Sequence, residues 1–275
     1  MKRILFPTDF SETATNAFVH ALEFAKVIKG ELILLHTFEL PIMDTQFFPQ
    51  NYMEIYESLE LSQFDMFKEE VPKLRAIAQE HNLDRIKMSH RLMDGDLLYA
   101  IEKAIKEDKI DYVVMGTDGA SGWSTFFTGT NTGTVLTDVE VPTYCIPNGA
   151  KFKKIETIGF TTRFREKDKK ALNDILKIAK KANAQVQCLY VKTAVSDVLN
   201  ETVKEWEKEF EAVTFWITLS DNVKESIADF IVNKDIDVLT MLTYKRNFFE
   251  GLFSPSFTKK IATSINIPVL VVPIR

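Results

Sequence analysis

The chain has 275 residues, 45% of them hydrophobic, with 34 Lys and Arg against 39 Asp and Glu and a formal net charge of −5. Domains cluster at about 100 to 150 residues, so this length favours two domains over one. The mixed charges create no sustained positive field, which argues against nucleic acid and membrane surfaces as partners. No segment approaches the roughly 18 apolar residues of a membrane helix, and the apolar stretch before Pro7 is too short for a signal peptide. We therefore expect a cytoplasmic location.

In the first half of the chain, apolar strand-like runs alternate with helical patterns. The first helix is the clearest, because Ser11 can cap its start, Gly30 can end it, and one apolar face runs from Ala14 to Ile28. Alternation of this kind predicts βαβ units and a doubly wound parallel sheet with helices on both faces. The five expected strands are residues 3–7, 32–37, 86–92, 112–116 and 143–147.

The second half of the chain repeats the first. Residues 110–115 read like residues 236–241, an offset of 236 − 110 = 126, which also carries Val141-Pro142 onto Ile267-Pro268. Near the start, Ile4 to Asp9 match Thr157 to Thr162 at an offset of 157 − 4 = 153, so the second copy is shorter by 153 − 126 = 27 residues. We expect two tandem α/β domains, residues 1–148 and 152–275, joined by a short polar linker.

The excess of the first copy falls between Glu39 and about Val71, in a stretch rich in aromatic residues and bounded by prolines. Two interpretations remain open at this point. The segment forms a lid or an extra helix over a ligand site, or it is a surface embellishment or a dimer contact.

A glycine pattern follows the fourth expected strand. Gly116 and Gly119 lack a Cβ, so the backbone can turn sharply at the carboxyl end of the strand, where ligands settle in a doubly wound sheet. Gly129 and Thr130, followed by Asn131, open a helical pattern whose free N–H groups can hold phosphate. The Thr130 hydroxyl adds a further donor. The pattern predicts a phosphate site.

Asp9 follows the first strand, where a carboxylate can accept hydrogen bonds from ribose hydroxyls, and Pro7 and Thr37 would border a base. Each residue also has a purely structural interpretation. Asp9 could cap the first helix, Gly129 could be a plain turn, and Gly116 could serve helix–strand packing. The combination of these residues at the right strand ends favours the nucleotide interpretation.

The residues Pro7-Thr8-Asp9-Phe10-Ser11 resemble the opening of universal stress proteins. Gly116-x-x-Gly119-x9-Gly129-Thr130 is similar to the G-x-x-G-x9-G-S/T motif of the ATP-binding branch of that family. The resemblance covers nearly the whole chain as two copies. It implies a five-stranded parallel sheet in the order 3-2-1-4-5 in each domain.

The resemblance also implies ATP, or AMP or ADP, bound in the first domain, with Mg or Mn allowed on the phosphates. It implies pairing of residues 143–147 with residues 269–273 inside the chain and is compatible with a homodimer. The expected nucleotide-binding residues are Pro7, Thr8, Asp9, Thr37, Met115, Gly116, Thr117, Gly119, Gly129, Thr130 and Asn131.

The second copy departs from the motif at the informative positions. By the offsets above, Gly116, Gly119 and Gly129 become Leu242, Lys245 and Pro255, Asp9 becomes Thr162, and Thr130 alone is replaced in kind, by Ser256. Bulky side chains and a proline without an N–H abolish a phosphate cradle. We therefore expect a second domain with a structural or regulatory role.

Three functions follow from the sequence. The first is an ATP-binding stress-response protein. The second is a slow ATP hydrolase or a phosphate or adenylyl transferase, although no Walker lysine, no nucleophile–base pair and no metal-ligand spacing is readable, so we assign no catalytic or metal residues. The third is an interaction or dimerisation module without nucleotide.

Overall fold

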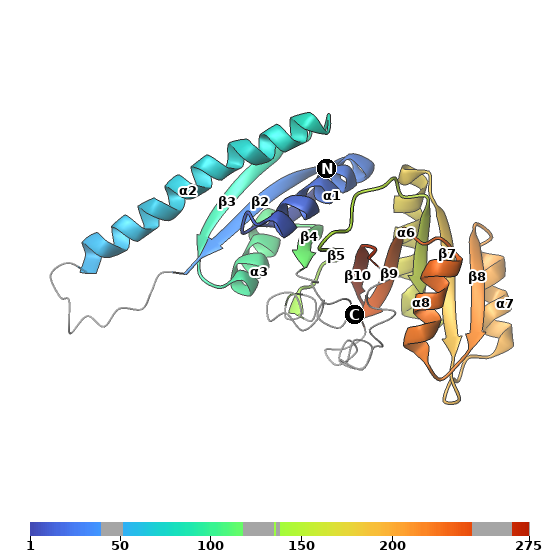
Figure 1. Ribbon diagram of the computed structural model, residues 1–275. Helices are drawn as coiled ribbons and strands as arrows, with labels where there is room; N and C mark the ends of the chain where they lie inside the picture. The colour runs from blue at the N-terminus through green and yellow to red at the C-terminus, as the bar shows by residue number, and fades with distance from the viewer. Residues whose placement is uncertain (40–51, 118–134, 136–137, 244–265, 275) are drawn as a thin grey trace. The chain divides into compact units, whose positions relative to one another are not determined.

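The computed structural model describes the chain apart from residues 40–51, 118–134, 136–137, 244–265 and 275. The chain divides into two compact units, Met1–Met115 and Gly116–Arg275 (Figure 1). Each unit is described by itself.

The described part of the first unit contains four strands, three of which are buried on both faces. Ile4, Leu5 and Phe6 of β1 are all fully buried, and because neighbouring side chains in a strand point to opposite faces, both faces of β1 are covered. The strand β1 runs parallel to β2 and β4, with Leu5 opposite Ile33 and Val113. The strand order is β3 (Met88–Asp94), β2 (Gly30–Phe38), β1 (Lys2–Pro7), β4 (Tyr112–Thr117). The third strand begins two residues later than the expected residue 86.

Helices α1 (Glu12–Ile28) and α3 (Leu97–Asp108) both contact β1 and β2, and α1 also contacts α2 (Tyr52–Glu80). The apolar face expected of the first helix is buried along its whole length, from Ala14 to Ile28. The Ser11 side chain accepts a hydrogen bond from the Ala14 N–H at 3.2 Å, which confirms the predicted cap.

The end of α1 differs from the expectation. Lys29, not Gly30, takes the left-handed conformation, with φ 58° and ψ 49°. Gly30 is instead the first residue of β2, where an added Cβ would lie 2.9 Å from the Lys2 carbonyl oxygen. The glycine is needed for the close approach of two strands, and the helix ends one residue earlier on a residue that pays a steric cost.

The excess of the first copy lengthens a helix. The helix α2 has 29 residues, whereas α7 (Asn200–Glu209), at the corresponding place of the second copy, has 10. The buried side chains of α2 lie in its C-terminal half, while Leu61 and Phe64 of the N-terminal half are more than half exposed. Figure 1 shows α2 extending past the strands of the first unit. The excess therefore lengthens a helix that both copies have and does not add the extra helix of the first interpretation; residues 40–51 lie outside the described residues.

The second unit contains six strands in the order β5 (Thr143–Pro147), β10 (Val269–Pro273), β9 (Val238–Thr243), β6 (Thr157–Thr161), β7 (Gln185–Lys192), β8 (Val213–Leu219). The last five follow the expected 3-2-1-4-5 order, read from β8. The sheet is parallel except that β5 pairs antiparallel with β10, with Cys145 opposite Val269. These are the two strands that the sequence analysis expected to pair.

Helices α6 (Glu166–Ala182) and α8 (Val223–Asn233) contact β7, and α7 contacts β8. Both cysteines, Cys145 and Cys188, are free and fully buried. Burial raises the pKa of both thiols, and at Cys188 the nearby Asp168 charge raises the pKa further.

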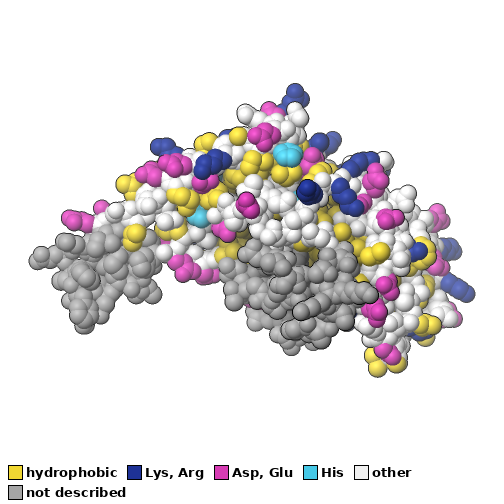
Figure 2. All heavy atoms as spheres, viewed as in Figure 1, with side chains coloured by type: hydrophobic (Ala, Val, Ile, Leu, Met, Phe, Trp, Pro, Cys, Tyr) yellow, Lys and Arg dark blue, Asp and Glu magenta, His cyan; other side chains and the backbone are white. Residues whose placement is uncertain are grey.

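Basic and acidic side chains are interspersed over the face of the molecule in Figure 2. None of the helices in the described part of the chain is long and apolar enough to cross a membrane.

Replacing Lys29 by Gly should stabilise the first unit by about 0.5–1 kcal/mol, because glycine adopts the left-handed conformation without a Cβ clash. Gly30→Ala should destabilise it by about 1–3 kcal/mol, because the new methyl group meets a backbone oxygen. Lys26→Gly, inside the last turn of α1, is the matched control and should destabilise. Denaturant unfolding of the three variants checks this order.

Thr240→Val should raise the unfolding temperature. The Thr240 hydroxyl is buried and has no hydrogen-bond partner among the described residues, and the corresponding residue of the first copy is the buried Val114. An unpaired buried hydroxyl costs about 1–3 kcal/mol. Thr162→Val is the control and should lower the unfolding temperature, because the Thr162 hydroxyl makes two hydrogen bonds that valine cannot make. Calorimetry that showed Thr240→Val to be destabilising would contradict this assignment.

Candidate functional site

A threonine, Thr8, stabilises the turn that follows β1, the central strand of the first copy. The Thr8 N–H donates to the Leu35 carbonyl oxygen at 2.8 Å, which extends the pairing of β1 with β2 by one residue. The Thr8 hydroxyl then accepts the Phe10 N–H at 3.0 Å, and Phe10 takes the left-handed conformation with φ 62°. This turn directs the chain from the sheet into α1 and leaves Asp9 at the carboxyl end of β1.

Asp9 is exposed at this strand end. Its Oδ1 accepts the Ser11 N–H at 3.0 Å, so it helps to start α1, as the structural interpretation expected, while Ser11 itself is the cap. From the described residues, Oδ2 receives no hydrogen bond. A carboxylate with four lone-pair sites and one local partner can still accept bonds from a ligand.

The other expected residues of the first unit lie near the same sheet edge. Because Leu5 pairs with Val113, Pro7 and Met115 occupy neighbouring positions two residues further along their strands. Pro7 and Met115 are buried, and Thr37 near the end of β2 is partly exposed. The order of the strands reverses between β1 and β4, and ligands bind doubly wound sheets at such points.

Gly116 and Thr117 are the last two residues of β4. The Thr117 side chain is buried, and its hydroxyl donates to the Ile146 carbonyl oxygen at 3.3 Å. This hydrogen bond links the end of β4 to β5. The remaining expected residues, Gly119, Gly129, Thr130 and Asn131, lie outside the described residues.

The strand registers correct the alignment of the two copies. Asp111 donates its N–H to the Arg3 carbonyl oxygen, and Asp237 does the same to Thr157, so the start of the copies is offset by 157 − 3 = 154 and not by 153. The Phe164 N–H donates to the Thr162 hydroxyl at 2.9 Å, as Phe10 does to Thr8, and Phe164 also has a positive φ, of 54°. Thr162 therefore corresponds to Thr8, and the counterpart of Asp9 is Arg163.

The second copy thus reverses the charge at the strand end. An exposed carboxylate, Asp9, stands in the first copy and an exposed guanidinium, Arg163, in the second. The next exposed position changes as well, because Ser11, the cap of α1, becomes Arg165, whose side chain cannot accept a hydrogen bond.

A buried carboxylate replaces the lost cap. Asp168 is fully buried, and its Oδ2 accepts hydrogen bonds from the Thr162 hydroxyl at 2.8 Å, the Arg163 N–H at 3.0 Å and the Arg165 N–H at 3.2 Å. Its counterpart in the first copy is Ala14. One side chain therefore fixes the whole turn that carries the two arginines.

A cavity of about 690 Å³ opens at the carboxyl ends of β6, β7 and β9. All of its lining residues belong to the second unit. The cavity lies at the point where the strand order of the second copy reverses between β6 and β9. Its inner wall is apolar, with buried Leu189, Ile227, Met241 and Leu242. The sequence analysis expected no ligand site in this copy.

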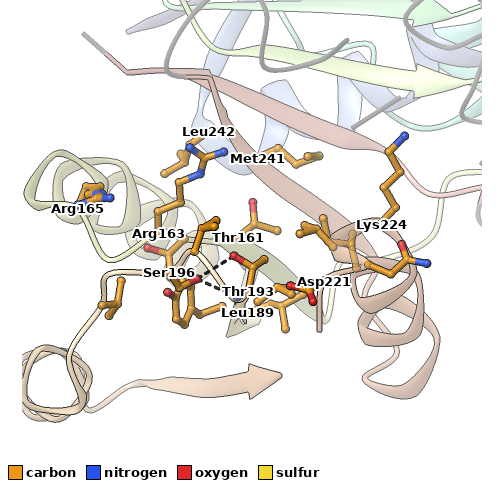
Figure 3. A pocket seen from close by; sticks show the side chains of 18 of the residues that line it. Thr161, Arg163, Arg165, Leu189, Thr193, Ser196, Asp221, Lys224, Met241 and Leu242 are labelled. Atoms are coloured by element: carbon orange, nitrogen blue, oxygen red, sulfur yellow. Dashed lines mark hydrogen bonds between the residues drawn. The ribbon is translucent and has the colours of Figure 1, made fainter. Parts of the chain in front are cut away.

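Charged groups stand around the cavity (Figure 3). Arg165 donates to both carboxylate oxygens of Asp197, at 3.0 and 3.1 Å, and Asp221 accepts the Ala194 N–H at 3.0 Å. Arg163 and Lys224 lie on opposite sides of the cavity in this view. Partial burial lowers the pKa of Lys224.

Sequence reasoning missed this cavity because it looked for a phosphate cradle alone, and the one-residue alignment error hid Arg163 as the counterpart of Asp9. The signal was present: Thr8-Asp9-Phe10 and Thr162-Arg163-Phe164 share a Thr-x-Phe pattern at an offset of 154.

In the described part of the chain, no group of three or more His, Cys, Asp and Glu side chains could hold a metal ion.

The folds and strand ends define a class: tandem doubly wound α/β repeats, each with a reversal of strand order at the carboxyl ends of its parallel strands. The family model that matches is the universal stress protein family, over residues 1–147 and 154–273. The chain belongs to the universal stress protein family.

Solved structures share this fold. A universal stress protein from Archaeoglobus fulgidus DSM 4304 is 19% identical, with a TM-score of 0.73 and 98% of each chain covered. A putative universal stress protein from Pseudomonas aeruginosa UCBPP-PA14 is 13% identical, with a TM-score of 0.63, covering all of this chain and 94% of its own. At these low sequence identities, the structural match shows a shared fold alone. No curated protein matches the chain.

Asp168→Ala should destabilise the second unit by about 3 kcal/mol, because it leaves three donors of the Thr162–Arg165 turn without their acceptor. Asp174→Ala on the same helix is the control, since Asp174 is half exposed and forms a surface ion pair with Lys177. Urea unfolding followed by tryptophan fluorescence measures both. Equal effects of the two substitutions would contradict the role of Asp168.

Proposed function

We propose that the first repeat binds an adenine nucleotide, with ATP as the principal ligand, and that the protein acts in a stress response through this binding. The observation that carries the proposal is the exposed Asp9 carboxylate at the carboxyl end of β1, where the strand order reverses between β1 and β4. Its Oδ2 faces no donor from the described residues and suits the paired hydroxyls of a ribose.

The surroundings of Asp9 support the same ligand. Pro7 and Thr37 come from the two strands on which a base would rest, and Met115 lies beside Pro7 on β4. The sequence motif Gly116-x-x-Gly119-x9-Gly129-Thr130 supplies main-chain N–H groups for the phosphates. A divalent ion, Mg or Mn, would act on the phosphates and not through a protein metal cluster.

We further propose that residues 1–148 and 152–275 are the two functional domains, and that the second does not share the nucleotide. Arg163 in place of Asp9 removes the ribose acceptor, and Leu242 in place of Gly116 puts a buried side chain where the phosphates would need backbone.

The first test is Asp9→Arg, which gives the first repeat the residue of the second. The full chain should bind one ATP in calorimetric titration with Mg²⁺, and Asp9→Arg should lower the affinity by about 10- to 150-fold, because an acceptor of charge-assisted bonds worth about 1.5–3 kcal/mol is lost. Asp9→Asn should lose less.

Asp84→Arg is the matched control, because it makes the same charge change at an exposed position of the first unit outside the proposed site. ATP affinity should be unchanged in this variant. Equal affinity of Asp9→Arg and the unaltered chain, or no nucleotide binding and none released on denaturation, would refute the proposal and favour a nucleotide-free interaction module. Steady ATP turnover that is lost in Gly129→Arg would make the protein a slow hydrolase.

A further inference from the structure

We propose that the cavity of the second repeat binds a small organic anion with an apolar body, held by Arg163 at the carboxyl end of β6. The cavity volume of about 690 Å³ falls in the range of about 300–1,000 Å³ found for small-molecule sites. The position at the reversal of strand order is the one where doubly wound sheets bind ligands.

The wall of the cavity selects an apolar body. Val191 and Leu242 stand where the first repeat has Thr37 and Gly116, so two positions that are polar or without a side chain become aliphatic. Leu189, Ile227 and Met241 complete a buried aliphatic surface behind them. Val195 lies at the cavity and is 91% exposed, so an apolar group at the mouth is left in water for a ligand to cover.

The charges around the cavity select an anion. Three cations, Arg163, Arg165 and Lys224, line it against two carboxylates, Asp197 and Asp221. Asp197 is held by both of its oxygens on Arg165, and Asp221 by a backbone N–H. The buried Asp168 behind the wall balances the third cation, so an anion is attracted locally, by the Arg163 guanidinium that lines the cavity, and not by a net positive charge.

The anion-binding end is preorganised by the protein interior. The buried Asp168 accepts the N–H groups of Arg163 and Arg165 and the hydroxyl of Thr162, so the backbone beneath both guanidinium groups is fixed before any ligand arrives. A fixed backbone lowers the entropy lost on binding. Hydroxyl groups of Thr161, Thr193 and Ser196 add neutral hydrogen-bonding groups to the lining.

The same features distinguish this ligand from a nucleotide. A ribose needs acceptors at the end of the central strand, and Arg163 offers only donors. The aliphatic Leu242 occupies the strand position that the motif reserves for glycine. The ligand class is therefore a carboxylate or sulfonate on an aromatic or aliphatic body, and ATP becomes the competitor to test.

The experiment uses the full chain and the fluorescent probe 8-anilinonaphthalene-1-sulfonate, which joins a sulfonate to aromatic rings. Binding should be saturable with one probe per chain, and Arg163→Gln should weaken it about tenfold or more through loss of a charge-assisted hydrogen bond. Val191→Phe, which fills the cavity, should abolish it. Lys177→Gln on the exposed face of α6 is the control and should have no effect.

Two further arms separate the alternatives. N-phenyl-1-naphthylamine has the same rings without the sulfonate, so its binding should not change in Arg163→Gln. Saturating ATP should leave the sulfonate probe bound. Displacement by ATP in both the unaltered chain and Asp9→Arg, or equal probe affinity in the unaltered chain, Arg163→Gln and Val191→Phe, would overturn the proposal. Unchanged circular dichroism and unfolding temperature of each variant exclude misfolding as the cause.

Discussion

The hydrogen bond from a phenylalanine N–H to the hydroxyl of the threonine two residues earlier fixes how the central strand of each repeat leaves the sheet. It joins Phe10 to Thr8 at 3.0 Å and Phe164 to Thr162 at 2.9 Å. Each phenylalanine takes a left-handed conformation that is costly for a bulky side chain. Aromatic packing offsets that cost, since the Phe164 ring lies 5.1 Å from both Tyr190 and Trp206. Because this turn is held, the residue between threonine and phenylalanine is presented at the strand end.

That presented residue carries the difference between the repeats. The same backbone displays a carboxylate at Asp9 and a guanidinium at Arg163. The exchange required a second change, because Ser11 caps its helix and Arg165 cannot. Asp168 restores the lost acceptor from inside the helix and is buried to do so. This rebuilt turn supports the proposal that the second repeat binds a ligand of different chemistry from the first.

Much of the fold could be predicted from the sequence, and the main error has a physical cause. The helix α1 with its apolar face, the Ser11 cap and the pairing of β5 with β10 agree with the structure. The error was one residue in the register of β6. In a strand buried on both faces, such as Ile4-Leu5-Phe6, hydrophobicity has no period of two, so a slip of one residue leaves the pattern unchanged. Hydrogen bonds, which do not tolerate such a slip, reveal the true correspondence.

The end of α1 and the length of α2 show the same limit. Glycine after a helical pattern suggests a left-handed cap, yet Gly30 serves the contact of β2 with Lys2 across the sheet, a demand that no local pattern contains. In α2 the C-terminal half packs against the core through residues such as Phe67 and Leu74. The Phe67 ring stacks on His36, whose Nδ1–H donates to the Thr8 carbonyl oxygen at 2.7 Å. The longer helix α2 therefore contacts the turn that presents Asp9 through His36, so a displacement of either would change the position of the other.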